Sequence, residues 1–352
     1  AESTVEEREK STEKVLKNTL KRDNSDATAN YLLGNLLYDK RPEQAMTYWK
    51  KAIELNSSFS MAWRNLAFGT FYHQKDPEQA INYLTKAISR DNSHPLWFDE
   101  LSRYYDESRR DYKNILAILR DNLDVVKKDV AAPKAYIKLL NLNGDYEEAI
   151  NFLENYHFRT WEGGRETYWS YVNAHTLQAM ELLKNNQIEI AINELNKALL
   201  YPENLEVGKP LHDEKNAMIY YFMGEAYQKM GENKQAQRSY EKSITSQNGP
   251  GMTDLLYFQG KAFEKLNQPE KAKQIFENLI TKGKKLREGD SDNRSIGVAQ
   301  ATLGNNKTIS YAYYLEALGY KGLKNSGKAK QEFKTAINIY PNNLWAKIMM
   351  KH

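Results

Sequence analysis

The chain has 352 residues, with 50 Lys plus Arg against 46 Asp plus Glu, so its formal charge of +4 is small for its length. This balance predicts no nucleic-acid partner, because nucleic-acid-binding domains carry a marked basic excess. The lack of cysteine excludes disulfides and thiolate chemistry, and no apolar run approaches the roughly 18 residues of a membrane span. We expect a soluble chain without membrane contact, whose compartment stays open.

The first predicted element is a helix over 4–20, with no complete helix before it. The segment 17–25 is similar to 50–57 and 85–93, and each of these three segments closes the second helix of a pair. We therefore expect the chain to begin inside a longer helical array or just after an upstream domain.

Two helical pairs are predicted next, at 27–56 and 60–92. Pro42 and Pro77 fit the first turn of the second helix in each pair, where a missing N–H is not costly. A more divergent pair is predicted at 95–128 and another at 132–155.

The middle of the chain interrupts this pattern. A glycine-containing loop at 158–166 precedes helices at 167–184 and 187–200, and a second loop follows at 201–210. Two strong repeats come next, then an insertion predicted at 282–308, a final pair, and a capping helix at 344–350.

The two strong repeats share one spacing of key residues, i, i+3, i+4 and i+7 on a first helix and i, i+4 and i+7 on a second. The matched residues are Tyr220, Met223, Gly224, Tyr227, Ala236, Tyr240 and Ser243 in one copy, and Leu256, Gln259, Gly260, Phe263, Ala272, Phe276 and Leu279 in the next. We expect the two glycines and two alanines to allow close helix approach.

A degenerate period of about 34 residues is that of tetratricopeptide helix-turn-helix units. We predict an all-α, right-handed solenoid over 1–352, with about seven or eight helical pairs. Sub-blocks at 1–157 and 167–352 could be joined by the loop between them.

Four motifs carry a closer resemblance. YLLGNLLYDKR (31–41), AWRNLAF (62–68), FRTWEGGRE (158–166) and YPENLEVGKP (201–210) resemble the C-terminal tetratricopeptide region of large, mainly bacterial proteins. The N-terminal domain of those proteins has no known function and is similar to the galactose-mutarotase β-sandwich. The resemblance implies a fragment of a longer, carbohydrate-associated protein, with its own upstream domain or another protein as partner.

The first candidate site is the loop pair. An aromatic face, carboxylates and flexible glycines suit a sugar or an inter-domain contact, while a structural corner is the plainer interpretation. The candidate residues are Trp161, Glu162, Gly163, Gly164, Glu166, Asn204 and Lys209. Catalysis by the two carboxylates is not favoured, because nothing sets their separation across a substrate.

The second candidate site is the concave groove of the solenoid, which suits a peptide or a glycan. By the repeat register it is lined by Tyr31, Asn35, Tyr38, Arg64, Phe68, Tyr72, Tyr221, Glu225, Gln228, Tyr257 and Lys261. Asn35 and Asn65 match the asparagines with which chaperone-binding tetratricopeptide domains clamp a C-terminal carboxylate. The required lysine is replaced by Tyr31, so that ligand is rejected.

Metal binding and cofactors are not predicted, because the six histidines show no paired metal spacing and no phosphate-loop or nucleophile motif occurs. We predict a non-catalytic protein-interaction scaffold. Two alternatives are a sugar site to which the 158–166 loop contributes, and a free peptide-binding adaptor.

Overall fold

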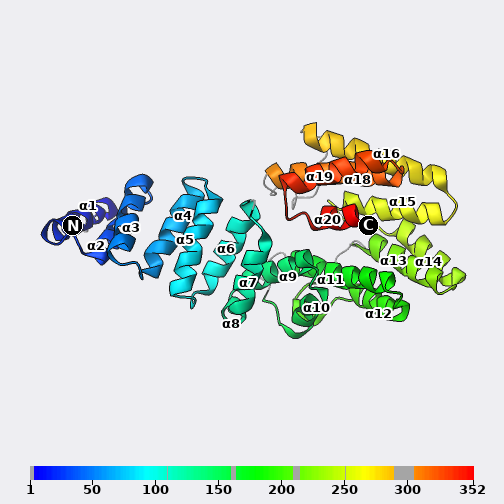
Figure 1. Cartoon of the computed structure of the whole chain (residues 1–352), viewed down its shortest axis with the longest axis horizontal. Coiled ribbons are helices and arrows are strands. Elements are labelled where there is room, and N and C mark those ends of the chain that lie inside the picture. Colours follow the sequence, from blue (N-terminus) through cyan, green and yellow to red (C-terminus); the bar gives the residue numbers. More distant parts are fainter. Residues whose placement is uncertain (1–3, 109, 160–163, 209–214, 250, 289–304) are drawn as a thin grey trace. The chain divides into compact units, whose positions relative to one another are not determined.

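The structure, a computed structural model, describes residues 4–108, 110–159, 164–208, 215–249, 251–288 and 305–352. Within these ranges every regular element is an α-helix or a short 3-10 helix, which confirms the all-α solenoid (Figure 1). The chain divides into two compact units, Ala1–Tyr136 and Ile137–His352. This division falls inside α9 (Ala132–Asn143), whereas the loop at 158–166 lies within the second unit.

The first unit consists of helices that follow one another at short turns. They are α1 (Val5–Arg22), α2 (Ala27–Leu37), α3 (Pro42–Leu55), α4 (Ser60–Tyr72), α5 (Pro77–Arg90), α6 (Pro95–Glu107), α7 (Tyr112–Asp121) and α8 (Leu123–Val126). Pro42 and Pro77 are the first residues of α3 and α5, as predicted. The divergent pair is α6 and α7, and the short α8 is an addition that the sequence pattern did not indicate.

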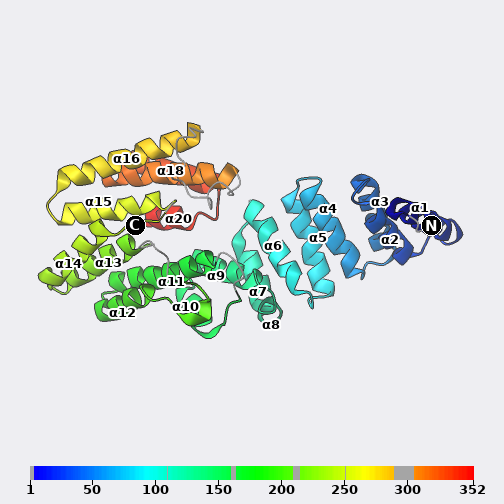
Figure 2. The same cartoon turned by 180° about the vertical axis from the view of Figure 1, so that it is seen from behind.

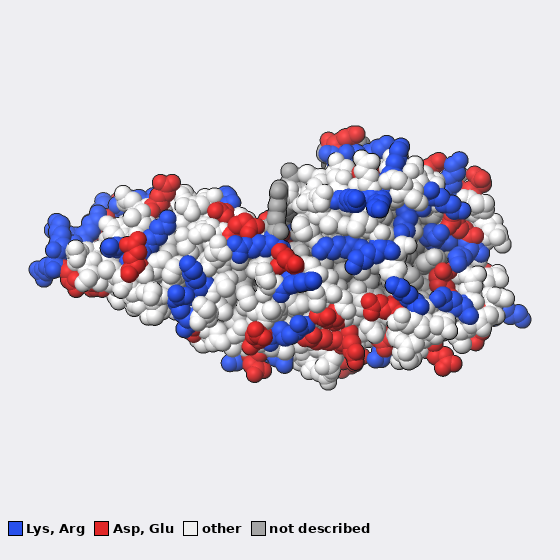
Figure 3. Space-filling model, viewed as in Figure 1, with Lys and Arg blue, Asp and Glu red and all other residues white. Residues whose placement is uncertain are grey.

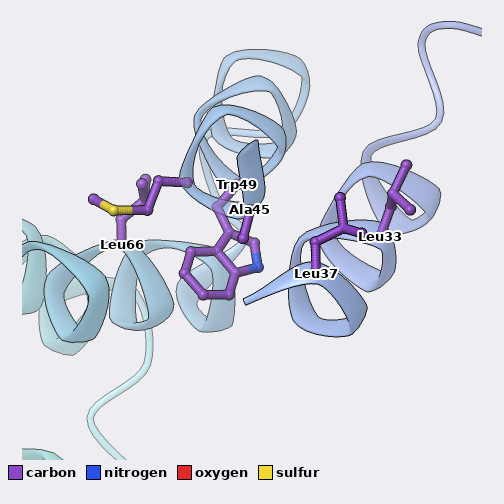
Figure 4. Close-up of a cluster of buried hydrophobic side chains, with 6 residues drawn as sticks. Leu33, Leu37, Ala45, Trp49 and Leu66 are labelled. Atoms are coloured by element: carbon purple, nitrogen blue, oxygen red, sulfur yellow. The ribbon is translucent and has the colours of Figure 1, made fainter. Parts of the chain in front are cut away.

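The core of the first unit is assembled from the facing stripes of neighbouring helices. Leu33 and Leu37 of α2, Ala45 and Trp49 of α3, and Leu66 of α4 form one buried cluster (Figure 4). Each large aliphatic or aromatic side chain buried in this way contributes roughly 1.5–3 kcal/mol relative to exposure. Helices α2 and α3 are thus held together through their side chains. Leu66 of α4 joins this pair to the next.

The second unit is also built of helices that pack against their neighbours along the chain. It contains the end of α9, then α10 (Tyr146–Asn155), α11 (Arg165–Lys184), α12 (Ile188–Ala198), η1 (Glu203–Leu205), α13 (Asn216–Lys229), α14 (Asn233–Thr245), η2 (Thr253–Leu255), α15 (Leu256–Lys265), α16 (Pro269–Glu288), α18 (Asn305–Gly322), α19 (Ser326–Ile339) and α20 (Leu344–Lys351). The pairs α11–α12, α13–α14, α15–α16 and α18–α19 are the helix-turn-helix units of this part.

The predicted close approach at the repeat glycines is confirmed. The ring of Tyr240 on α14 lies against Gly224 of α13, where it fills the space of a side chain. Trp49 lies against Gly34 in the same way in the first unit. Ala236 and Ala272 are buried on α14 and α16, the second helices of their pairs. Small residues therefore occur on both helices of each pair.

The predicted insertion at 282–308 is wrong at both ends. Helix α16 continues to Glu288 and α18 begins at Asn305, so only 289–304 lie outside the described residues. Gly283, which the prediction placed in the insertion, instead lies against α18: an added Cβ would stand 2.6 Å from the carbonyl oxygen of Ala312. The glycine allows the two long helices to pack closely.

The last helix of the second unit does not stand at its outer end. Figures 1 and 2 show α20, in red, lying among the helices of this unit. Its contacts include α19, Asn173 of α11, Phe258 of α15 and Lys321 of α18. The capping helix therefore packs on several first helices at once.

Candidate functional site

The predicted groove rings Tyr38, Phe68 and Tyr72 form an aromatic row at the end of α2 and along α4. The ring centroids of Tyr38 and Phe68 are 5.7 Å apart, and those of Phe68 and Tyr72 are 4.6 Å apart. Tyr31 stacks on Phe59 at 4.7 Å. Tyr31, Tyr38 and Phe68 are half-buried and Tyr72 is exposed, so these rings present apolar faces to solvent while their inner edges are packed.

Two asparagines lie beside this row and hold each other in place. Asn35 Oδ1 accepts a hydrogen bond from the indole Nε1 of Trp49 at 2.9 Å and another from Asn65 Nδ2 at 2.8 Å. Because an indole N–H can only donate, these bonds fix the orientation of the Asn35 amide. Its Nδ2 group is left as a donor on an exposed side chain.

Arg64 is a predicted groove residue, and its charge is already matched within the protein. Its guanidinium is paired with both carboxylate oxygens of Glu100, with Nε 2.9 Å from Oε2, and it lies over the Phe68 ring at 5.0 Å. Burial would lower the pKa of Arg64, but the hydrogen bond and charge of Glu100 raise it instead. Arg64 thus has little capacity left for an anionic ligand.

Glu100 is the residue that sequence reasoning missed here. It is 2% exposed on α6, and it lies 36 residues after Arg64, about one repeat period. The next basic side chain of the groove, Arg103, is likewise paired, with Asp99 at 3.2 Å, and donates to the Tyr72 hydroxyl at 2.9 Å. Both basic side chains are therefore already paired within the protein.

The predicted groove residues of the second unit are less accessible. Tyr221 and Tyr257 are only 8% and 6% exposed. Glu225 and Gln228 both contact the Tyr240 hydroxyl, at 2.6 and 3.0 Å. They also bind Lys265, and Lys261 is paired with Glu264. Most polar groups of this set are therefore used within the protein.

Helix α20 contacts the first helices of three pairs, α11, α15 and α18. Trp345, 9% exposed, donates from Nε1 to Asn173 Oδ1 at 3.3 Å, and its ring is 6.5 Å from that of Phe258. Lys321 donates to the carbonyl oxygen of Met349 at 2.7 Å, so a cation lies at the C-terminal end of α20. The i, i+4 spacing of Trp345 and Met349 indicated an apolar face, but nothing local indicated what that face would cover.

The two loops of the middle region meet at their described residues. Asn204 Nδ2 lies 2.7 Å from the carbonyl oxygen of Leu153 and 2.8 Å from that of Tyr156, both at the end of α10. The Phe158 N–H donates to Asn204 O at 2.8 Å, and His157 lies 2.9 Å from Glu206. Asn204 thus has a structural role as the cap of a helix end.

The rest of this candidate site is only partly described. Gly164 has a helical φ of −56° and is the N-cap of α11, and Glu166 is exposed in the first turn of that helix. Trp161, Glu162, Gly163 and Lys209 lie outside the described residues. Their contact with a sugar or another domain stays a prediction.

One open cleft of the first unit was not predicted. It has a volume of about 580 Å³ and lies between α5, α6 and α7. It is lined by Gln79, Asn82, Thr85, Lys86, Tyr105, Arg110, Asn114 and Ile118. Arg110 is held there by Glu78 and by Asn82 Oδ1, at 2.5 and 2.8 Å, so its charge too is matched.

Among the described residues, no helix is both long and apolar enough to cross a membrane. In the same part of the chain, no three His, Asp or Glu side chains gather as metal ligands.

Helical pairs with small residues facing rings define a helical-repeat scaffold. A model of the tetratricopeptide repeat matches residues 69–94, 217–249 and 310–343, and a second model of this repeat matches 254–282. The chain therefore carries tetratricopeptide repeats in both units.

Solved structures with a similar fold are distant. YrrB, a TPR protein with an unusual peptide-binding site, is 18% identical with a TM-score of 0.37, over 52% of this chain and 90% of that chain. A chain of Naa15/Naa10 bound to HypK-THB is 14% identical with a TM-score of 0.47, over 96% of this chain and 57% of that chain. MamA is 17% identical with a TM-score of 0.28, over 58% of this chain and 97% of that chain.

Proposed function

We propose that this chain is a protein-interaction scaffold and that the first unit binds a peptide segment of a partner protein. The binding surface is the aromatic groove, defined as Tyr31, Asn35, Tyr38, Asn65, Phe68 and Tyr72. The supporting observation is that these rings are partly exposed while their orientations are held from behind by Phe59, Trp49 and one another. Pre-ordered aromatic surfaces bind with little loss of side-chain entropy.

The groove chemistry limits the ligand. Arg64 and Arg103 are neutralised by Glu100 and Asp99, so the groove offers apolar faces and amide groups rather than net charge. An uncharged apolar or aromatic peptide segment suits it best, with backbone carbonyls facing the Asn35 Nδ2 donor. In the second unit the corresponding tyrosines are buried and the polar groups are paired within the protein, so we assign peptide binding to the first unit.

Selection of a random peptide library on the purified chain would test this proposal. We expect the selected peptides to be apolar, and the double variant Tyr38→Ala, Phe68→Ala to bind them at least about tenfold more weakly. Tyr83→Ala is the matched control, because Tyr83 is a half-buried ring on α5 that packs on Trp63. Equal binding by both variants, or protection from hydrogen exchange outside α2, α4 and α6, would contradict the assignment.

We further propose that the chain is the repeat region of a larger bacterial, carbohydrate-associated protein, on the strength of the four motifs alone. In that setting the loop at 158–166 contributes Trp161 to an upstream β-domain or its sugar. Calorimetric titration of that domain with wild type and Trp161→Ala tests this. Binding that is lost in the variant supports the loop contact, and undiminished binding removes it.

A further inference from the structure

We propose that the second unit has a second docking surface, formed by lysines around α20, which binds an acidic segment of a partner protein. This lysine surface is defined as Lys138, Lys184, Lys307, Lys321, Lys347 and Lys351. It goes beyond the proposed function because it uses another unit, another set of residues and the opposite kind of ligand from the uncharged aromatic groove.

Charge is strongly segregated toward the end of the chain. Residues 305–352 contain eight lysines and two glutamates, a net charge of +6, whereas the whole chain is only +4. The remaining 304 residues therefore carry a net charge of −2. Figure 3 shows lysine and arginine side chains, in blue, gathered over α18, α19 and α20 on one face of the molecule. The small net charge of the chain conceals this local excess.

The fold brings lysines from distant parts of the second unit to the two ends of α20. At its beginning, Lys138 of α9 and Lys307 of α18 both lie over the ring of Tyr340, at 5.9 and 5.5 Å, and Lys138 Nζ lies 3.1 Å from the Tyr340 hydroxyl. At its end, Lys321 of α18 contacts the carbonyl oxygen of Met349. The convergence exists only because α20 packs among these helices.

Several lysine charges act on the groups at the end of α20. Burial and then the charges of Lys184, Lys321 and Lys351 lower the pKa of His352. Burial and then the charge of Lys261 lower the pKa of Lys321. Burial is the larger cause in both groups, and the like charges nearby act in the same direction.

The two glutamates of the segment do not neutralise the lysine surface. Glu316 is nearly buried and its Oε1 lies 2.7 Å from Arg287 Nε of α16. It follows Lys307 by nine positions, which places it about 180° around α18 from that lysine. Glu332 lies near Glu316, since its charge raises the pKa of Glu316 after the larger effect of burial. Glu316 is thus paired with Arg287, and Glu332 lies near Glu316.

The chemistry of the surface favours an acidic protein segment over other anions. Residues 305–352 contain no arginine, the side chain that binds phosphate and base edges with two parallel hydrogen bonds. Trp345 and Met349 are buried, so α20 offers neither a ring for base stacking nor an apolar face for a lipid surface. Flexible lysines match carboxylates on an extended chain.

The test compares three probes on the full chain by fluorescence anisotropy: a short polyglutamate peptide, an oligothymidylate of equal charge, and phosphatidylserine vesicles. The variant carries Lys138→Gln, Lys184→Gln and Lys351→Gln, all at exposed positions that leave the Lys321 cap intact. The control carries Lys234→Gln, Lys273→Gln and Lys285→Gln, exposed lysines on α14 and α16 with the same loss of charge.

We expect polyglutamate to bind best, with an affinity that falls as salt rises and is about tenfold weaker in the variant but nearly unchanged in the control. Equal loss in variant and control would mean general charge attraction and overturn the proposal. Absent polyglutamate binding, or tighter binding of the oligonucleotide or the vesicles, would also overturn it. The aromatic-groove variant Tyr38→Ala, Phe68→Ala should bind polyglutamate like wild type, so the two proposals fail separately.

Discussion

The ring of Phe276 lies between Gly260 and Gly322: a Cβ added to either glycine would stand 2.5 Å from Phe276 Cε1. Gly260 belongs to α15, Phe276 to α16 and Gly322 to α18, so one ring fills space that two absent side chains leave open. This contact joins one helical pair to the next. Gly224 and the ring of Tyr240 pack in the same way. The spacing of small residues and rings in the repeat therefore determines how the helices pack.

Replacing Gly260 with Ala should therefore destabilise the second unit. Alanine is the better helix former by about 1 kcal/mol, but overpacking a filled core costs typically 1–3 kcal/mol, and here the contact is far below a normal carbon separation. We expect urea unfolding to show a net loss of about 1–2 kcal/mol. Gly327→Ala on α19 is the control, because an added Cβ there meets nothing within 4 Å. A Gly260→Ala protein as stable as this control would refute the packing argument.

Arg64→Ala should be strongly destabilising, because it leaves the carboxylate of Glu100 buried without its partner. Removal of one member of a buried ion pair costs about 3–5 kcal/mol, whereas replacing both by apolar residues is often nearly neutral. The double variant Arg64→Met, Glu100→Leu should therefore recover most of the stability in thermal unfolding. If Arg64→Ala were neutral while peptide binding was lost, Arg64 would be a ligand residue rather than a structural one.

The helical pairs could be predicted from sequence because their signals are local. Gly224 and Tyr240, or Pro42 at the start of α3, act within one repeat, where spacing along the chain determines spacing in space. The pairing of Arg64 with Glu100 was also within reach, since the two are separated by about one period. Gly283 was placed in the insertion because a glycine in a loop and a glycine that allows close approach of a neighbouring helix look alike in sequence.

The position of α20 could not be predicted in this way. Trp345 reaches Asn173, 172 residues earlier, because small rotations between successive helical pairs add up over the whole second unit. No pattern within one repeat predicts this accumulated rotation. The lysine surface around α20 depends on this position, so it was not apparent in the sequence. Tyr221 and Tyr257, which the repeat register placed in an open groove, are buried and contact Phe258 of α15 and Phe276 of α16.

Trp345→Ala should loosen α20 from the second unit. The indole is nearly buried and contacts both α11 and α15, and loss of such a ring costs about 3–5 kcal/mol. Hydrogen exchange should become faster in α20 and in the facing helices. Met350→Ala, at an exposed position of the same helix, serves as the control. Unchanged exchange in α20 of the Trp345→Ala protein would contradict the observed packing.

We expect the contact between Glu194 and His175 to stabilise the fold less in acid. Its Oε2 lies 2.6 Å from Nδ1 of the fully buried His175, and Oε1 lies 3.6 Å from Lys197. Burial raises the pKa of Glu194, but the hydrogen bond and charge of His175, together with Lys197, lower it below the ordinary 4.5. A depressed carboxyl pKa adds stability that is present above the unfolded-state value and is lost as the pH falls through the folded-state value.

Glu194→Gln should thus be less stable than wild type near neutral pH, and the difference in urea midpoint should shrink below a pH of about 4.5. The exposed Glu189→Gln on the same helix should follow wild type at each pH, and a gap for Glu194→Gln that widened in acid would show that the sign of this coupling is wrong.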